Sequence, residues 1–146
     1  MRTITEIIVH CTDTEAGNDY SVTEIDRWHR QRGFAEIGYH YIIHPDGMID
    51  TGRAVTKIGA HCKGHNRYTI GVAYIGGRKD DKAANTLTTF QVIAIKNLLN
   101  LLCLMYPSIK TITGHNQYSS KACPCFDVPR FVKEMGVKTF AERHKE

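Results

Sequence analysis

Two histidines and one cysteine occupy positions from which they could act together. His10 ends an apolar, β-prone run that begins at Ile4, and His115 follows a second short apolar run, residues 109–112. Cys123 comes a short loop later, in the segment HNQYSSKAC. Polar residues at strand ends are where α/β folds assemble their sites. We therefore expect His10, His115 and Cys123 to converge at one edge of a sheet.

Two imidazoles and a thiolate form a ligand set that suits Zn²⁺. Three protein ligands leave the fourth tetrahedral position to water, as in catalytic zinc sites, where the metal lowers the pKa of that water to about 7. The spacing of His115 and Cys123 is not a common zinc spacing, so a core histidine, a loop histidine and a free thiol stay open as an alternative. Copper would need a methionine, and none lies near these segments in the sequence.

The number and spacing of the cysteines exclude several kinds of cysteine-based site. The chain has five cysteines, an odd number, and no Cys-x-x-Cys pair. This pattern argues against a disulfide framework, a zinc finger and a thioredoxin-type motif. Cys103 lies within an apolar helical pattern and is expected in the core. Cys123 could also be a nucleophile with His115 as its base, which is a second chemistry for the same residues.

The composition is that of one globular domain. The chain has 146 residues, of which 42% are hydrophobic and 23% charged, which excludes a disordered or coiled-coil protein. A net charge of +4 is too small to indicate nucleic-acid binding. The longest apolar stretch, residues 98–106, is too short to insert into a membrane. The N-terminus has no apolar signal region, so we expect synthesis in the cytoplasm without a signal peptide.

Strands and helices alternate along the chain. Capping boxes at Ser21–Glu24 and Thr88–Gln91 predict two helices, of which the second carries a broad apolar stripe that ends at Met105. Hydrophobic patterning and turn residues predict the other elements: strands at 4–10, 38–44, 48–50, 70–75 and 109–112, and a last helix at 129–135. The sequence therefore predicts a single α/β domain, residues 1–146, with a central mixed sheet flanked by helices. Residues 137–146 are expected to form a peripheral polar tail.

Five short segments carry the resemblance of this sequence to a known family. They are IIVHCT, GYHYII, IGAHCKGHN, IGVAYIGG and GHNQYSSKACPCFD, and they follow one another in this order. Together they resemble the zinc-dependent N-acetylmuramoyl-L-alanine amidases of type 2. The resemblance is greatest to the small phage-lysozyme amidases, with the peptidoglycan recognition proteins as more distant relatives. It extends from about Ile4 to Phe131.

The resemblance implies a fold, an activity and a set of site residues. The implied fold is a mixed sheet with flanking helices and one zinc ion on one face. The family's metal ligands fall on His10, His115 and Cys123, its catalytic tyrosine on Tyr39 and its catalytic lysine on Lys121. The implied reaction is hydrolysis of the amide bond between the lactyl group of N-acetylmuramic acid and L-alanine of the stem peptide. Cys125 departs from the family pattern, and we assign it no role.

The loop at 52–68 supplies further candidates. We expect His61 and Asn66 to line the substrate groove, although His61 could instead support another residue and Asn66 could cap a turn. Four basic residues give this segment a positive surface that could guide the carboxylates of a stem peptide. They are Arg53, Lys57, Lys63 and Arg67.

The expected partner is peptidoglycan or its muropeptides, bound by a monomer that acts on the cell wall in the manner of a phage endolysin. One alternative is a peptidoglycan-recognition domain without activity, but such relatives lose the metal-binding cysteine that stands here at Cys123. Another is a regulatory protein, such as an inhibitor of a polymerase. The chain starts only a few residues before the first strand, without the N-terminal arm of some phage members, which argues against that role.

Overall fold

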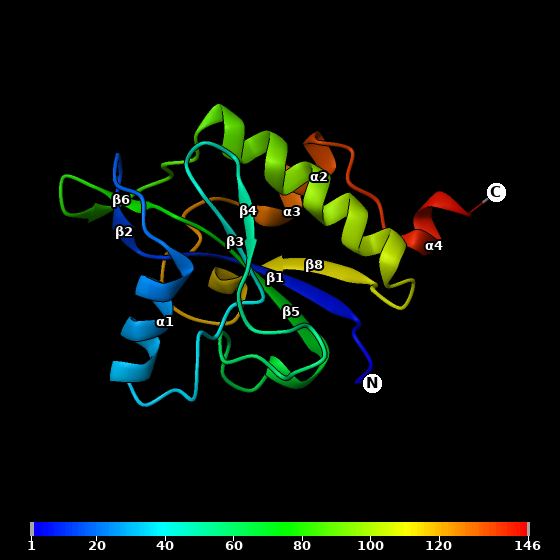
Figure 1. The fold of residues 1–146 in the computed structure, drawn as a ribbon. Helices are drawn as coiled ribbons and strands as arrows, with labels where there is room; N and C mark the ends of the chain where they lie inside the picture. Colours follow the sequence, from blue (N-terminus) through cyan, green and yellow to red (C-terminus); the bar gives the residue numbers. More distant parts are fainter. Residues whose placement is uncertain (1, 146) are drawn as a thin grey trace.

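A five-stranded mixed sheet forms the centre of the computed structural model, which describes residues 2–145 (Figure 1). Its strand order is β4-β3-β5-β1-β8. The strands are β1 (Glu6–Cys11), β3 (Tyr41–Ile43), β4 (Ile49–Thr51), β5 (Thr69–Tyr74) and β8 (Thr111–Gly114). β1 runs parallel to both β5 and β8, while β3 and β4 form an antiparallel hairpin. The predicted mixed sheet is confirmed.

Helices cover both faces of this sheet. Helix α2 (Thr89–Met105) and the shorter α3 (Val128–Glu134) pack on one face, and α1 (Val22–Gln31) lies on the other (Figure 1). The two buried clusters reflect this arrangement. Leu99 of α2 and Phe131 of α3 pack in the larger cluster, while Ile25 of α1 packs in the smaller one with Ile42 and Ala73.

Both predicted capping boxes form. Ser21 accepts a hydrogen bond from the Glu24 backbone while the Glu24 carboxylate accepts one from the Ser21 backbone, and Thr88 and Gln91 do the same for α2. Each box satisfies donors that the first helical turn would otherwise leave unpaired. Helix α1 ends before Gly33, whose φ of 96° is a left-handed conformation that glycine adopts without a steric penalty. The helix boundaries expected from the sequence are therefore right to within about two residues.

The alternation of side chains along β1 decides what faces the site. Ile7 and Val9 point into the larger cluster, toward α2. His10 consequently points to the opposite face, the side on which α1 and the 52–68 loop lie. This alternation puts a polar side chain at the end of a strand that is buried along its whole length.

Three features differ from the sequence-based expectation. A small second sheet, formed by β2 (Thr14–Glu15), β6 (Gly77–Lys79) and β7 (Lys82–Ala83), was not predicted, because strands this short carry no usable alternation. β8 runs from Thr111 to Gly114, whereas the sequence predicted this strand at 109–112. Within the segment 137–145, which we expected to be a peripheral polar tail, Val137 and Thr139 are buried and Thr139 caps the helix α4 (Phe140–Arg143), while residues 141–145 are exposed.

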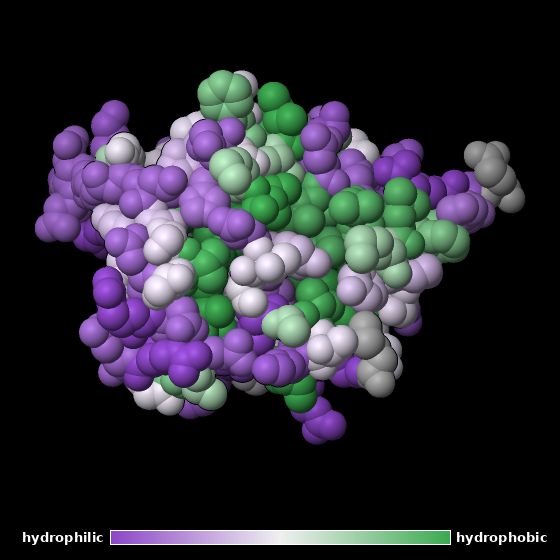
Figure 2. Space-filling model, in the orientation of Figure 1, coloured by the Kyte–Doolittle hydropathy of each residue, from purple (hydrophilic) through white to green (hydrophobic). Residues whose placement is uncertain are grey.

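The outer face of α2 is more apolar than expected. Figure 2 shows hydrophilic surface around α1 and the β2–β6 end, and hydrophobic side chains along the α2 side. Met105, which we expected on the buried stripe, is 54% exposed. The other large exposed hydrophobic residues of this helix are Phe90, Ile93, Leu101 and Leu104. Helix α2 therefore uses only its inner face for the core. Within the described residues, no helix is long and apolar enough to cross a membrane.

Two buried histidines hold the segment around Tyr39 in place as neutral rings. His29 of α1 is buried, and its Nδ1 accepts a hydrogen bond of 2.8 Å from the Gly38 backbone. His40 is fully buried, and its Nδ1 accepts from the Gly71 backbone at 3.0 Å. An unprotonated Nδ1 is needed in both bonds. Burial is the main reason that the pKa of each histidine falls to about 4.

We expect the fold to lose stability as the pH falls from about 6.5 to about 4, before most carboxylates are protonated. An unfolded chain binds protons at His29 and His40 near pH 6.5, whereas the folded chain binds them only near pH 4. Each histidine should therefore lower the free energy of unfolding by roughly 2 kcal/mol across this interval, after allowance for solvent screening. Urea unfolding of chelator-treated protein at several pH values measures the effect.

The variant His29→Asn is the control for this pH dependence, because its amide oxygen can accept the same backbone N–H and does not titrate. It should show a weaker dependence than the parent. His44 acts in the other direction: burial opposes its charge, but hydrogen bonds to Asp19 and Asp50 outweigh burial and raise its pKa. Its contribution is complete below about pH 6.5 and is lost as the pH rises through its raised pKa. A urea midpoint that is constant from about pH 6.5 to 4 would contradict the prediction.

Candidate active site

The register of two parallel strands brings His10 and His115 together. Val9 of β1 is paired with Gly114 of β8, so the residues that follow these two lie at the same level, next to each other. Those residues are His10, still within β1, and His115, the first residue of the 3-10 helix η2 (His115–Gln117). Their ring centroids lie 4.7 Å apart. The convergence predicted from the strand ends is therefore present.

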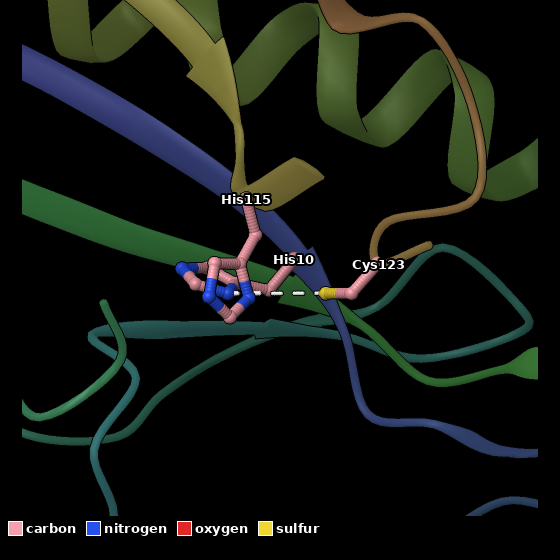
Figure 3. A group of neighbouring side chains, drawn as sticks. All are labelled: His10, His115 and Cys123. Atoms are coloured by element: carbon pink, nitrogen blue, oxygen red, sulfur yellow. Dashed lines mark hydrogen bonds between the residues drawn. The ribbon is translucent and has the colours of Figure 1, made fainter. Parts of the chain in front are cut away.

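Cys123 reaches the same place from the loop that follows η2. Its Sγ lies 3.9 Å from Nδ1 of His10 and accepts a hydrogen bond of 3.2 Å from the Cys11 backbone N–H. Candidate ligand atoms of His10, His115 and Cys123 all lie within 4.8 Å of one another. Figure 3 shows the two rings and the thiol directed toward a common point. A metal ion held at that point would have two nitrogen ligands and one sulfur ligand.

The surroundings of the two histidines favour neutral rings. Burial, reinforced by the nearby charges that His61 and His115 would carry if protonated, lowers the pKa of His10 well below its usual value. Burial and then the charge of Lys121 lower the pKa of His115. A neutral imidazole has a free nitrogen lone pair, which is the form that binds a metal ion.

The surroundings of Cys123 favour a thiolate. Hydrogen bonds from the thiol and the backbone N–H of Cys11 lower the pKa of Cys123, although burial acts against them. Cys125 shows the contrast, because burial raises its pKa to about 11. Of these two cysteines, only Cys123 is therefore prepared to bind a metal ion or to act as a nucleophile.

Tyr39 and Lys121 flank the cluster. The Tyr39 ring lies 5.4 Å from the His10 ring between centroids, and its hydroxyl donates a long hydrogen bond of 3.4 Å to the Cys11 carbonyl. Burial is the main cause that raises the pKa of Tyr39, so its hydroxyl stays protonated. Lys121 is exposed, and its charge is near enough to lower the pKa of His115.

His61 and Asn66 lie behind this cluster. Nδ1 of His61 is 2.8 Å from Nε2 of His10, and Nε2 of His61 is 3.2 Å from the Thr69 hydroxyl. The Asn66 side-chain oxygen accepts hydrogen bonds from the backbone N–H groups of His61 and Cys62. Asn66 thus caps a turn, the alternative left open by the sequence. Both residues also border the adjacent cavity, so a contact of either with substrate stays a prediction.

A cavity of about 910 Å³ opens in front of the cluster. Its cations are Arg32, Lys63, Arg78 and Lys121, and its one carboxylate, Asp13, is paired with Arg78 at 3.2 Å. A neighbouring hollow of about 770 Å³ shares part of its wall with the cavity. The cavity is therefore suited to an anionic ligand that extends beyond the cluster.

The basic loop residues act differently from one another. The Arg53 guanidinium donates to three backbone carbonyls, those of Glu36, Ile37 and Ile58, and so holds the loop together. Lys57 pairs with Glu36. Lys63 borders the cavity, as does Arg32 at the end of α1, which the sequence analysis did not select. Nothing in a linear sequence indicates which cation turns toward a cavity and which binds carbonyl groups.

Tyr74 is a second residue that the sequence analysis missed. It is fully buried at the end of β5, and its hydroxyl donates a hydrogen bond of 2.7 Å to the Pro124 carbonyl. This bond ties the residue next to Cys123 to the central sheet. A tyrosine in the otherwise aliphatic run IGVAYI is the signal that could have drawn attention to it, because a buried hydroxyl needs a partner.

Two histidines at the carboxyl ends of parallel strands, joined by a cysteine from the following loop, define a candidate metal centre of the kind found in hydrolases. Residues 1–126 match the family Amidase_2, described as N-acetylmuramoyl-L-alanine amidase. The chain belongs to this family, whose members hydrolyse the bond between N-acetylmuramic acid and L-alanine. The family and the enzyme class that the sequence resemblance implied are confirmed.

Curated relatives agree with this assignment. The endolysin of Enterobacteria phage K11 is 39% identical over 130 residues, which cover 88% of this chain and 85% of the relative. The endolysin of Escherichia phage T7 is 36% identical over 126 residues, covering 86% of this chain and 83% of the relative.

Solved structures agree on the fold. The N-acetylmuramoyl-L-alanine amidase LysC from Clostridium intestinale superimposes with a TM-score of 0.79 at 28% identity, over 94% of this chain and 88% of that one. Drosophila PGRP-LB gives a TM-score of 0.74 at 25% identity, over 100% of this chain and 88% of that one.

The Tyr74 hydroxyl can be tested with Tyr74→Phe. The change leaves the ring in the core but removes the donor to Pro124, and we expect it to lower the free energy of unfolding by about 1–2 kcal/mol. Amide hydrogen exchange at Ala122, Cys123 and Cys125 should become faster, since Pro124 itself has no amide hydrogen. Tyr41→Phe is the matched control, because no hydrogen bond of the Tyr41 hydroxyl occurs within residues 2–145. Equal exchange rates in residues 122–125 of both variants would contradict the anchoring role.

Proposed function

We propose that this amidase hydrolyses its substrate with one zinc ion held by His10, His115 and Cys123. The observation that carries the proposal is the convergence of these three side chains within 4.8 Å in front of a cavity. The donor set fits zinc, since two neutral imidazoles and a thiolate are its preferred ligands and leave one position open. A zinc ion there would supply Lewis acidity, which polarises a carbonyl and acidifies water near neutral pH.

Tyr39 is the proposed hydrogen-bond donor to the reacting amide. Its raised pKa keeps the phenol protonated, so it can donate to the oxygen on which negative charge develops. Its existing bond to the Cys11 carbonyl is long, which makes the hydroxyl easy to redirect. A base role for Tyr39 would require an ionised phenol, which burial disfavours.

Lys121 is the proposed cation at the mouth of the site. Its ammonium group can stabilise developing negative charge on the carbonyl oxygen, and it can donate a proton to the amine that leaves when the carbon–nitrogen bond breaks. In the overall reaction, water supplies the hydroxyl group of the new carboxyl group and a proton for the amine. The influence of Lys121 on the pKa of His115 supports its closeness to the metal ligands.

The charge around the cavity supports an anionic substrate. Stem peptides carry carboxylates, and the cations of the cavity outnumber its one acid, Asp13. Arg32 and Lys63 have no ion pair within residues 2–145, so either can receive a substrate carboxylate. With endolysins among its relatives, the chain is proposed to act on the bacterial cell wall as a monomeric muropeptide-cleaving enzyme.

Replacing the sulfur ligand tests the metal proposal. We expect Cys123→Ser to lose nearly all bound zinc at neutral pH, because a serine hydroxyl does not ionise there and a neutral oxygen is a poor zinc ligand. Purified parent protein should contain about one zinc per chain. Incubation with peptidoglycan should release stem peptides that begin with L-alanine, identified by mass, and the variant should release none.

Cys125→Ser is the matched control for this experiment and should retain zinc. A parent protein that binds zinc but cleaves nothing would support a recognition domain. Cleavage that survives a chelator but is lost in Cys123→Ser would instead support a cysteine nucleophile with His115 as base. Cleavage that survives both treatments would disprove the zinc mechanism.

The proposed roles of Tyr39 and Lys121 predict a loss of turnover without a loss of zinc, unlike the replacement of Cys123. We expect Tyr39→Phe and Lys121→Met each to reduce kcat by roughly 10²–10³-fold while zinc content stays unchanged, because both groups act on the transition state. Steady-state cleavage of a soluble muropeptide, with metal analysis of the same samples, measures both quantities. Lys110→Met, an exposed lysine away from the cavity, is the control. Full activity of the Tyr39 variant would remove that residue from the mechanism.

A further inference from the structure

We propose that His61 is a positioning residue, which together with Thr69 fixes the tautomer of His10 so that its Nδ1 lone pair faces Cys123. The proposal rests on the proposed metal role of His10. It assigns His61 the supporting task that the sequence left open beside a substrate contact, and it adds Thr69 to the site.

The two nitrogens of His10 face different neighbours. Nδ1 lies 3.9 Å from Sγ of Cys123, the direction marked by the dashed line in Figure 3. Nε2 points away from the cluster and lies 2.8 Å from Nδ1 of His61. Only one nitrogen of a neutral imidazole carries a proton, so the neighbour of Nε2 determines whether Nδ1 is free to bind a metal ion.

A backbone carbonyl sets the direction of the whole chain of hydrogen bonds. The Thr69 hydroxyl must donate to the His65 carbonyl, 2.8 Å away, because a carbonyl oxygen only accepts. Because the hydroxyl proton of Thr69 is used in that bond, the Thr69 oxygen can only accept from Nε2–H of His61, at 3.2 Å. Nδ1 of His61 is then unprotonated and accepts from Nε2–H of His10 at 2.8 Å. Nδ1 of His10 is left with its lone pair.

The backbone holds the His61 ring in the required orientation. A Cβ atom at Gly71 would lie 2.6 Å from Cγ of the ring, and one at Gly59 would lie 2.8 Å from its Cδ2. The ring therefore fills a slot that exists because both residues lack side chains. Asn66 fixes the His61 backbone by accepting its N–H at 3.0 Å. His61 is only 9% exposed.

This network leaves no ring nitrogen of His61 for a substrate, because one is engaged with His10 and the other with Thr69. Metal-ligating histidines commonly donate their second N–H to such a partner, and loss of the partner weakens metal binding by about 10–100-fold. The same range is expected here. A substrate-binding role would change KM instead and leave metal affinity unaltered.

Two pairs of variants test the proposal. His61→Phe keeps a ring of similar size but removes the acceptor, and His61→Asn supplies an amide oxygen that can accept from His10. Thr69→Val removes the hydroxyl from the chain of hydrogen bonds, and Thr69→Ser restores it. Two quantities are measured: the imidazole tautomers in metal-free protein, by nitrogen-15 NMR, and the zinc affinity, by competition with a chromophoric chelator.

In the metal-free parent, His10 should be the Nε2–H tautomer alone. His61→Phe and Thr69→Val should give a mixture of tautomers and lower the zinc affinity about 10–100-fold, while His61→Asn and Thr69→Ser should stay within about threefold of the parent. Thr139→Val is the matched control, a buried threonine that loses its hydrogen bond to Glu142 far from the site. It should change the thermal midpoint but neither the tautomers nor the zinc affinity.

The proposal is overturned if His10 is the Nδ1–H tautomer in the parent, or if Thr69→Val leaves both measurements unaltered. A raised KM with unchanged zinc affinity in His61→Phe would return His61 to a substrate-binding role. Should His61→Phe fail to fold, the Thr69 pair decides. Failure of the zinc proposal itself is recognised separately, because the parent would then bind no zinc while its tautomers remain measurable.

Discussion

The parallel pairing of β1 with β8 is the constraint on which the site depends. Because Val9 and Gly114 are partners across these strands, His10 and His115 lie side by side at the carboxyl-terminal end of the two strands. A shift of one residue in this register would separate the two rings and turn the apolar residues of one strand away from the core. The hydrophobic cluster under α2 resists such a shift, since Ile7, Val9 and Ile112 are all packed in it. The energy that fixes the geometry of this candidate metal site thus comes largely from the core.

Around this frame, burial and hydrogen bonding prepare each side chain for its chemistry. Burial keeps His10 neutral, hydrogen bonds from Cys11 favour the thiolate of Cys123, and burial keeps Tyr39 protonated. Two of these effects come from burial and one from hydrogen bonding, and they give compatible states: two kinds of candidate metal ligand and one hydrogen-bond donor. The cations that line the cavity add attraction for carboxylates.

The supporting residues show how the site is made rigid. Tyr74 ties the Cys123 loop to the sheet through Pro124, and Asn66 holds the turn that carries His61. Tyr74 uses one hydrogen bond and Asn66 two, in each case between a buried or partly buried side chain and the backbone. Such bonds contribute modestly to global stability, but they restrict a loop at the place where ligand geometry matters.

The sequence by itself determined the elements and the main candidates. Capping boxes marked α1 and α2, apolar runs marked β1 and β5, and strand-end positions selected His10 and His115, because these signals are local and each depends on a few neighbouring residues. The sequence also supplied the segments that identify the family. It did not reveal the second sheet, the ordered residues 137–145 or the buried position of His29, since none of these has a strong local pattern.

Only the tertiary structure decided how the candidates relate to one another. It joined His61 to His10 and Thr69, set Arg53 to hold a loop while Arg32 borders the cavity, and placed the Cys11 backbone against the Cys123 sulfur. Several of these relations connect residues far apart in the chain, such as His10 with His61 and Cys11 with Cys123. They follow from strand order and register, which depend on the packing of the whole core. No short stretch of sequence therefore predicts them.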